Sequence, residues 1–119
     1  MNRELYPELL DYIYDYCWQF ANELEKKATN HRFAQVKFGK RKLIHHELIE
    51  VRDRHLTDDK AALELLKDGY LAFRHNTAKR IYNDHKQELV LNLCPKCNKI
   101  ARTPKAKQCR FCSHSWREY

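Results

Sequence analysis

Four cysteines near the C-terminal end form two closely spaced pairs, C-P-K-C and C-R-F-C, with eleven residues between the pairs. They are Cys94, Cys97, Cys109 and Cys112. Two cysteines three positions apart form a tight turn that directs both thiolates to one place, and two such turns together supply four sulfur ligands in a tetrahedral arrangement. Zinc is the usual occupant of such a site, although iron also accepts four thiolates. The spacing therefore predicts one zinc ion per chain.

The predicted metal site is structural rather than catalytic, because four protein ligands leave no open coordination position. His114, two residues beyond the last cysteine, is expected to lie at the surface or just outside the ligands. The fifth cysteine, Cys17, has no cysteine near it in the sequence and is expected to be a small buried apolar residue. Cysteines that bind metal instead of forming disulfides are typical of a reducing compartment, which predicts a cytoplasmic location.

The two turns resemble the knuckles of a zinc ribbon, and this resemblance covers only about residues 88–118. Zinc ribbons commonly have glycine after the second cysteine of each knuckle, where this chain has Asn98 and Ser113. The resemblance implies two small hairpins that share one metal ion. It also implies two kinds of role: binding of nucleic acid or of a nucleic-acid complex, or service as a structural clip or protein contact.

Charge is distributed unevenly along the chain, whose formal net charge is +7. Residues 91–119 contain seven Lys/Arg and one Glu, a net +6, which falls to about +4 when four thiolates and one divalent zinc are counted. A basic surface attracts polyanions, and exposed aromatic rings between the cations stack on unpaired bases. The aromatic candidates are Phe111, Trp116 and Tyr119. The candidate nucleic-acid-binding cations are Lys96, Lys99, Arg102, Lys105, Lys107 and Arg110.

A plainer interpretation of the same residues stays open. The cations would then form a solvated surface, while Ile100, Phe111 and Trp116 would form a small core for the module. The same two interpretations apply to a second basic stretch, His31–Lys42, which contains Phe33 and Phe38.

Apolar residues at steps of three and four predict helices at about 6–28, 42–56 and 58–86, with an irregular connection over 29–42. The last helix is expected to begin at the Thr57-Asp58-Asp59 capping cluster and to run through Gly69. Candidate strands are Leu89–Leu93, Ile100–Thr103 and Ser113–Arg117. The expected fold is mainly α: a three-helix domain, residues 1–87, followed by a small β zinc-ribbon module, residues 88–119.

The leading functional hypothesis is a non-enzymatic zinc protein that binds DNA, RNA or a nucleic-acid complex through the basic module. The alternative is a protein–protein adaptor whose zinc site only braces the fold. A metal-dependent nuclease is a third hypothesis, suggested by His75-Asn76 and His85, but these residues fall in a predicted helix and no catalytic set is evident. The chain shows neither an apolar run long enough to span a membrane nor an apolar signal core, so no membrane association is expected.

Overall fold

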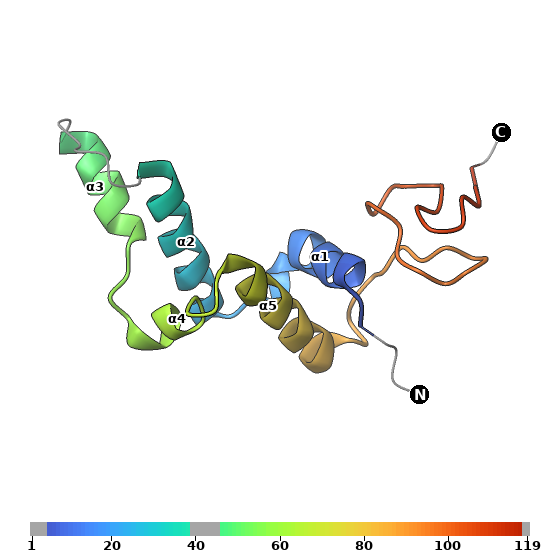
Figure 1. Ribbon diagram of the computed structural model, residues 1–119, viewed down its shortest axis with the longest axis horizontal. Coiled ribbons are helices and arrows are strands. Elements are labelled where there is room, and N and C mark those ends of the chain that lie inside the picture. Colours follow the sequence, from blue (N-terminus) through green and yellow to red (C-terminus); the bar gives the residue numbers. More distant parts are fainter. Residues whose placement is uncertain (1–4, 39–45, 118–119) are drawn as a thin grey trace. The chain divides into compact units, whose positions relative to one another are not determined.

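The computed structural model describes residues 5–38 and 46–117 (Figure 1). The mainly helical class is confirmed, but the described residues form five α-helices rather than three. No β-strand forms in these residues, and the expected strands are reduced to two isolated antiparallel bridges, Leu93–Ile100 and Gln108–Ser115. The helices are α1 (Pro7–Tyr16), α2 (Glu23–Phe38), α3 (His46–His55), α4 (Lys60–Glu64) and α5 (Tyr70–His85), with a 3-10 turn η1 (Trp18–Phe20) after α1.

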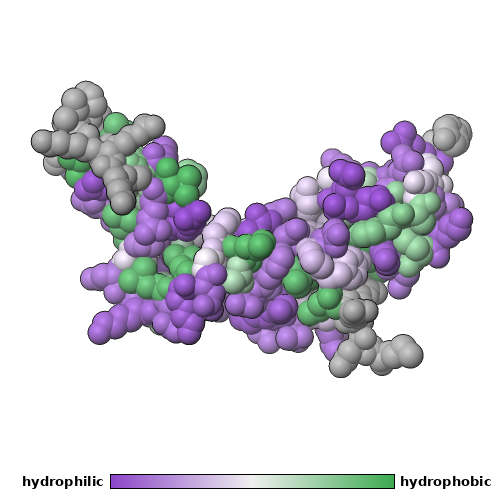
Figure 2. Space-filling model, in the orientation of Figure 1, coloured by the Kyte–Doolittle hydropathy of each residue, from purple (hydrophilic) through white to green (hydrophobic). Residues whose placement is uncertain are grey.

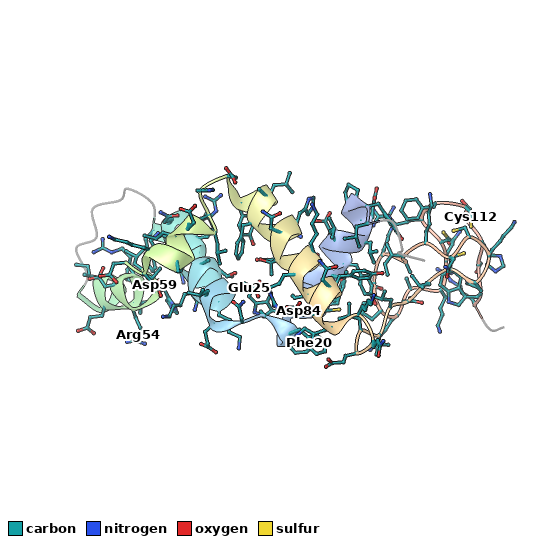
Figure 3. All side chains as sticks on the ribbon, turned by 90° about the horizontal axis from the view of Figure 1, so that it is seen from below. Phe20, Glu25, Arg54, Asp59, Asp84 and Cys112 are labelled. Atoms are coloured by element: carbon teal, nitrogen blue, oxygen red, sulfur yellow. The ribbon has the colours of Figure 1, made fainter. Side chains whose placement is uncertain are left out.

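The helix expected over 6–28 is wrong, because the chain breaks between α1 and α2. At the start of α2 the Asn22 side chain accepts a hydrogen bond from the Glu25 amide, and the Glu25 carboxylate accepts one from the Asn22 amide, both at 2.8 Å. Glu25 is labelled in Figure 3. This reciprocal capping satisfies two amides that a helix start leaves without partners, so it fixes a new helix there. The expected connection over 29–42 is helical as far as Phe38, and its remainder lies outside the described residues.

The long helix expected over 58–86 is also wrong, because it divides into α4 and α5. Its predicted start is confirmed, since the Asp59 side chain accepts from the Ala61 amide at 3.0 Å. The break comes at Gly69, whose φ of +97° is a conformation that residues with a Cβ rarely adopt. The helix expected over 42–56 is observed as α3, and 42–45 lie outside the described residues.

The chain divides into two compact units. The first contains the residues up to Phe20 together with those from Arg74 onward, and the second contains Ala21–Phe73. The first unit therefore joins the cysteine-rich segment to α1 and to most of α5. The domain boundary predicted after residue 87 differs from this division into two units. It stays a prediction.

The first unit has an apolar core with charged contacts at its edge. Leu9, Ile13, Ile81 and Ile100 are fully buried, and Cys17 is buried as expected. Beside this core, α1 and α5 are joined by an ion pair and a hydrogen bond. Arg74 reaches Asp15 at 3.2 Å, and His75 Nε2 lies 3.1 Å from an Asp11 carboxylate oxygen.

The second unit buries mostly small side chains, with Ala28, Ala34 and Ala62 fully or almost fully buried. Its helices are also linked by polar contacts, because the Thr57 amide donates to His31 Nδ1 at 3.0 Å and Lys27 pairs with Asp59 at 3.3 Å. Several larger apolar side chains remain exposed, and Figure 2 shows apolar groups at the surface among hydrophilic ones. In this unit they include Phe33, Val36, Leu48, Leu63, Leu65 and Leu71.

Candidate metal centre and cationic hollow

The four predicted ligands meet at one place, with their sulfur atoms all within 4.8 Å of one another. Cys94 Sγ lies 3.6 Å from Cys112 Sγ, and Cys97 Sγ lies 3.5 Å from Cys109 Sγ. Four sulfurs at about 2.3 Å from one zinc ion would be about 3.8 Å apart in a tetrahedron, whereas a disulfide brings two sulfurs to about 2.05 Å. The spacing therefore fits a shared metal ion. In the part of the chain that the structure describes, these four form the one group of three or more metal-ligating side chains so placed.

Two backbone turns of the same design position the cysteines. We call residues 92–101 the first knuckle and residues 107–116 the second. The Cys94 amide donates to the Lys99 carbonyl at 2.9 Å, and the Cys109 amide donates to the His114 carbonyl at 2.8 Å. Outside these bonds, Ala101 pairs with Asn92 and Trp116 with Lys107 in the same way. These two backbone hydrogen bonds therefore repeat at an offset of fifteen residues.

Each knuckle directs backbone amides at the sulfur of its first cysteine. The amides of Lys96 and Cys97 lie 3.4 and 3.5 Å from Cys94 Sγ. Cys109 Sγ receives the amides of Phe111 and Cys112 at 3.3 and 3.4 Å. Such contacts disperse the negative charge of a thiolate that binds metal, so the donor set around the sulfurs also fits a metal site.

The same contacts set the acidity of the thiols when the knuckles are folded. Burial acts to raise the pKa of Cys109, but the amides of Cys112 and Phe111 outweigh it and lower the pKa to about 6. Burial opposes the amides at Cys94 too, and its pKa is also lowered. The Lys99 amide acts to lower the pKa of Cys97, but burial and the neighbouring thiols raise it to about 11. One sulfur of each knuckle is thus prepared to be a thiolate.

The residue after each second cysteine adopts a left-handed backbone conformation. Asn98 has φ 63° and Ser113 has φ 66°. These are the positions where zinc ribbons commonly have glycine, so both knuckles keep the same turn without it. Asparagine tolerates this region well, whereas serine is more strained there.

The first knuckle is anchored on α1. The Ile100 amide donates to the Tyr6 hydroxyl at 2.8 Å. The Ile100 side chain is fully buried. Burial raises the pKa of Tyr12, even though the Asn92 amide donates to its hydroxyl and opposes the shift. Two phenols at α1 thus hold opposite ends of the first knuckle, and α1 becomes part of the frame of the metal site.

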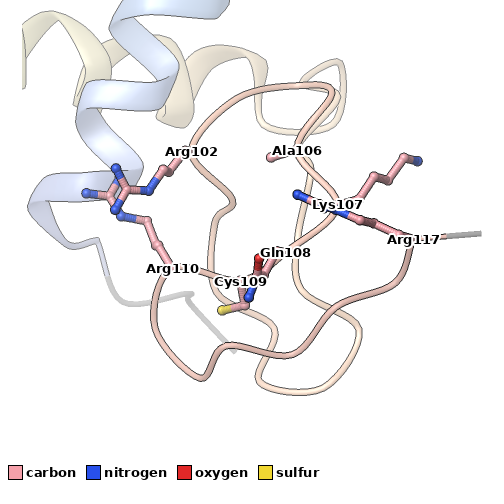
Figure 4. A pocket seen from close by; sticks show the side chains of 7 residues that line it. All are labelled: Arg102, Ala106, Lys107, Gln108, Cys109, Arg110 and Arg117. Atoms are coloured by element: carbon pink, nitrogen blue, oxygen red, sulfur yellow. The ribbon is translucent and has the colours of Figure 1, made fainter.

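Beside the second knuckle lies a hollow of about 420 Å³, which we call the cationic hollow (Figure 4). Arg102 and Arg110 lie on one side of it, and Lys107 and Arg117 lie on the other. Its remaining lining comes from Ala106, Gln108 and Cys109. Residues 89–117 contain seven Lys/Arg and no Asp or Glu. The hollow is therefore a place of concentrated positive charge beside the metal ligands.

The structure brings together only some of the predicted cations. Arg102, Lys107 and Arg110 line the hollow, whereas Lys96 and Lys105 are exposed elsewhere on the cysteine-rich segment. The sequence-based set did not include Arg117, because it considered only the cations around and between the cysteines. Arg117 ends the segment 89–117, which contains no Asp or Glu, and this position in the sequence indicates that it belongs with the other cations.

The aromatic residues of the knuckles and the candidate histidines lie in different surroundings. Ile100 is the core residue it was expected to be, but Phe111 is 38% exposed and Trp116 is only half-buried. His114 is not among the clustered ligands, and its ring stacks on Trp116 with centroids 6.2 Å apart. The histidines of the nuclease hypothesis, His75 and His85, contact different carboxylates, those of Asp11 and Glu88.

Comparison with known proteins finds no matching family model, no similar curated protein and no similar solved structure. The class of this protein therefore follows from its site: a mainly helical protein with a four-cysteine cluster placed to bind a metal ion. None of the helices described combines the length and the apolar content needed to cross a membrane.

Proposed function

We propose that this chain is a non-enzymatic zinc-ribbon protein of a reducing compartment such as the cytoplasm, and that it binds nucleic acid through its second knuckle. The observation that carries the proposal is the cationic hollow, where four cations surround one cavity in a segment without a single carboxylate side chain. Phosphate groups are the polyanionic partner that such a cavity fits.

Zinc in this proposal is held by Cys94, Cys97, Cys109 and Cys112 and supplies folding free energy to the knuckles. About thirty residues with two isolated bridges bury too little surface to fold without such a brace. The four sulfurs leave no coordination position for a substrate, which supports a structural role. The hollow then has a fixed shape, because its lining includes Cys109 and the residues next to it.

The three arginines of the hollow suit phosphate better than lysines would. A guanidinium group presents several N–H donors in one plane and binds phosphate oxygens in pairs. Contacts of this kind neutralise backbone charge and release counterions, so affinity is sensitive to salt and nearly independent of sequence. We expect dissociation constants in the range of about 10⁻⁶ to 10⁻⁴ M at physiological salt.

The test is to replace Arg102, Lys107 and Arg110 by Glu and to titrate the protein into fluorescent oligonucleotides at several salt concentrations. Binding should weaken strongly, and the slope of log affinity against log salt should become shallower by about 0.7–0.9 for each phosphate that the protein no longer neutralises. A control with Lys60, Lys79 and Lys86 changed to Glu alters net charge equally at exposed positions outside the knuckles and should keep most of the binding. Both variants should retain one zinc per chain. Absence of binding by the unaltered protein at low salt would refute the proposal.

A protein–protein adaptor is the second candidate, and the exposed apolar side chains of the second unit favour it. Phe33 and Val36, one helical turn apart on α2, are 57% and 67% exposed. Changing both to Ser should then reduce binding of an apolar fluorescent dye without loss of stability. This candidate takes precedence if no oligonucleotide binds.

A further inference from the structure

We propose that the second knuckle selects single-stranded nucleic acid, by stacking one unpaired base on Phe111 while the cationic hollow holds a neighbouring phosphate. This inference rests on the proposed function and makes it narrower, because binding of phosphates alone would not distinguish single strands from duplexes.

Phe111 is an aromatic ring presented on a rigid turn. It is 38% exposed, although it lies in a segment with very little apolar core of its own. Its backbone is fixed, because its amide donates to Cys109 Sγ at 3.3 Å. Its ring meets that of Tyr6 at 85° with centroids 6.0 Å apart, so the two rings do not form a parallel stack. The position equivalent to Phe111 in the first knuckle is Lys96, so the shared turn does not itself require an aromatic residue here.

Cations connect this ring to the hollow. Lys99 Nζ lies 4.9 Å from the centre of the Phe111 ring, and the Arg110 guanidinium carbon lies 5.7 Å from it. Arg110 also lines the hollow, so one side chain borders both the ring and the cavity. Lys99 is exposed on a flexible four-carbon stem, and it can move from the ring to a phosphate when a base arrives. The arrangement therefore matches one nucleotide, with its base at the ring and its phosphate at the cations.

Base pairing decides which nucleic acid can use this arrangement. In a duplex the bases are stacked on one another and their faces are covered, whereas single strands offer them to aromatic side chains. Stacking of one base on one ring contributes about 1–3 kcal/mol and depends little on the base. We therefore expect a preference for single strands of about 5- to 150-fold, the same range converted to an affinity ratio.

The experiment compares the zinc-loaded full chain with its Phe111→Leu variant in anisotropy titrations. The probes are single-stranded DNA and RNA oligonucleotides of about 12 nucleotides, a length within the usual site size, and the matching DNA duplex. Leucine keeps an apolar contact for Tyr6 but has no ring. Affinity for both single strands should fall about 5- to 150-fold, while duplex affinity stays the same. Tyr16→Leu is the control, because Tyr16 is an aromatic residue of α1 that is 44% exposed and lies outside the knuckles and the cationic hollow.

A strand without bases separates stacking from charge. An abasic oligonucleotide keeps every phosphate, so it should bind the unaltered protein about as weakly as the duplex does, and Phe111→Leu should not weaken it further. If single strands, duplex and abasic strand bind equally and the variant changes none of them, base stacking is refuted while phosphate binding stands. If no probe binds even at low salt, the proposed function fails as well. Zinc content and circular dichroism of each variant show whether the knuckle remains folded.

Discussion

The two knuckles share two backbone hydrogen bonds but differ in their surroundings. In the first, Ile100 and Ala101 are buried, and Tyr6 binds an amide of the turn. In the second, the equivalent positions are Ser115, which is exposed, and Trp116, which is half-buried. The ligands differ too, since Cys112 is exposed and its equivalent, Cys97, is partly covered.

The difference indicates that the first knuckle anchors the segment beside α1, while the second exposes its side chains to solvent. Both knuckles bring their cysteines to one place, but the first is the one whose Ile100 side chain is fully buried and whose Ile100 amide donates to Tyr6 beside α1. The second is free to carry Arg110 and Phe111 at the positions where the first carries Pro95 and Lys96. In the proposed function, one metal ion would hold together a knuckle that anchors the segment and a knuckle that binds nucleic acid.

The largest effect should come from removing a ligand that both knuckles depend on. Cys109→Ser removes one of four thiolates, and metal binding supplies most of the folding free energy of such a module. We expect loss of zinc by elemental analysis and rapid amide exchange over residues 92–116, while circular dichroism retains the signal of α2. Cys17→Ala, a change at a cysteine outside the cluster, should keep one zinc per chain. Loss of all helical signal would mean that the helices and both knuckles fold as one unit.

Acid should remove the metal, because protons compete with it for every thiolate. In the folded arrangement of the second knuckle, the pKa of Cys109 is about 6, below its ordinary value of 9.0. This lowering stabilises the folded state above pH 9, and the advantage is lost as the pH falls through about 6.

We therefore expect full zinc occupancy at about pH 7.5 and release as the pH falls below about 6. Because the pKa of Cys97 is raised to about 11, zinc must displace its proton at neutral pH. Calorimetric titrations in two buffers with different ionisation enthalpies should show proton release on binding. Release of a full proton from each of the four thiols would contradict the asymmetry between Cys109 and Cys97.

The anchoring role of the first knuckle can be measured with a matched pair of substitutions. Ile100→Ala should destabilise the protein by about 2–5 kcal/mol, because it opens a cavity at a fully buried position. Ser115→Ala, at the equivalent exposed position, should change stability by no more than about 0.5 kcal/mol. Thermal unfolding of zinc-loaded protein gives both values. Equal effects would show that the knuckles are not divided into anchor and surface.

The smallest effect concerns the left-handed residue of each turn. Ser113→Gly should raise stability by about 0.5–1 kcal/mol, because glycine adopts a φ of 66° without steric cost. Asn98→Gly should gain less, because asparagine already tolerates this conformation. Melting temperatures of the two variants decide the order. A larger gain in stability at Asn98 would mean that the surrounding side chains, and not the backbone conformation, determine the energetic cost at these positions.

Two local signals would have corrected the predicted helix boundaries. Asn22 and Glu25 have the spacing of a capping box, which marks the start of α2 within the continuous apolar rhythm. Gly69 was expected to be tolerated inside a helix, yet its positive φ ends the turn after α4. In both places the local backbone determines where a helix ends or begins. The apolar periodicity indicates only which face of a helix is apolar.

By itself the sequence determined the four-cysteine cluster, the N-cap at Asp59 and the mainly helical class. Each depends on residues close together in the chain, whose geometry is local. Only the tertiary structure decided that Tyr6 holds the turn at Ile100, that Arg102 and Arg117 border the same cavity, and that Phe111 stays exposed. The physical reason is that these relations join residues far apart in sequence or depend on burial, and no local spacing encodes which side of a turn meets a helix and which meets water.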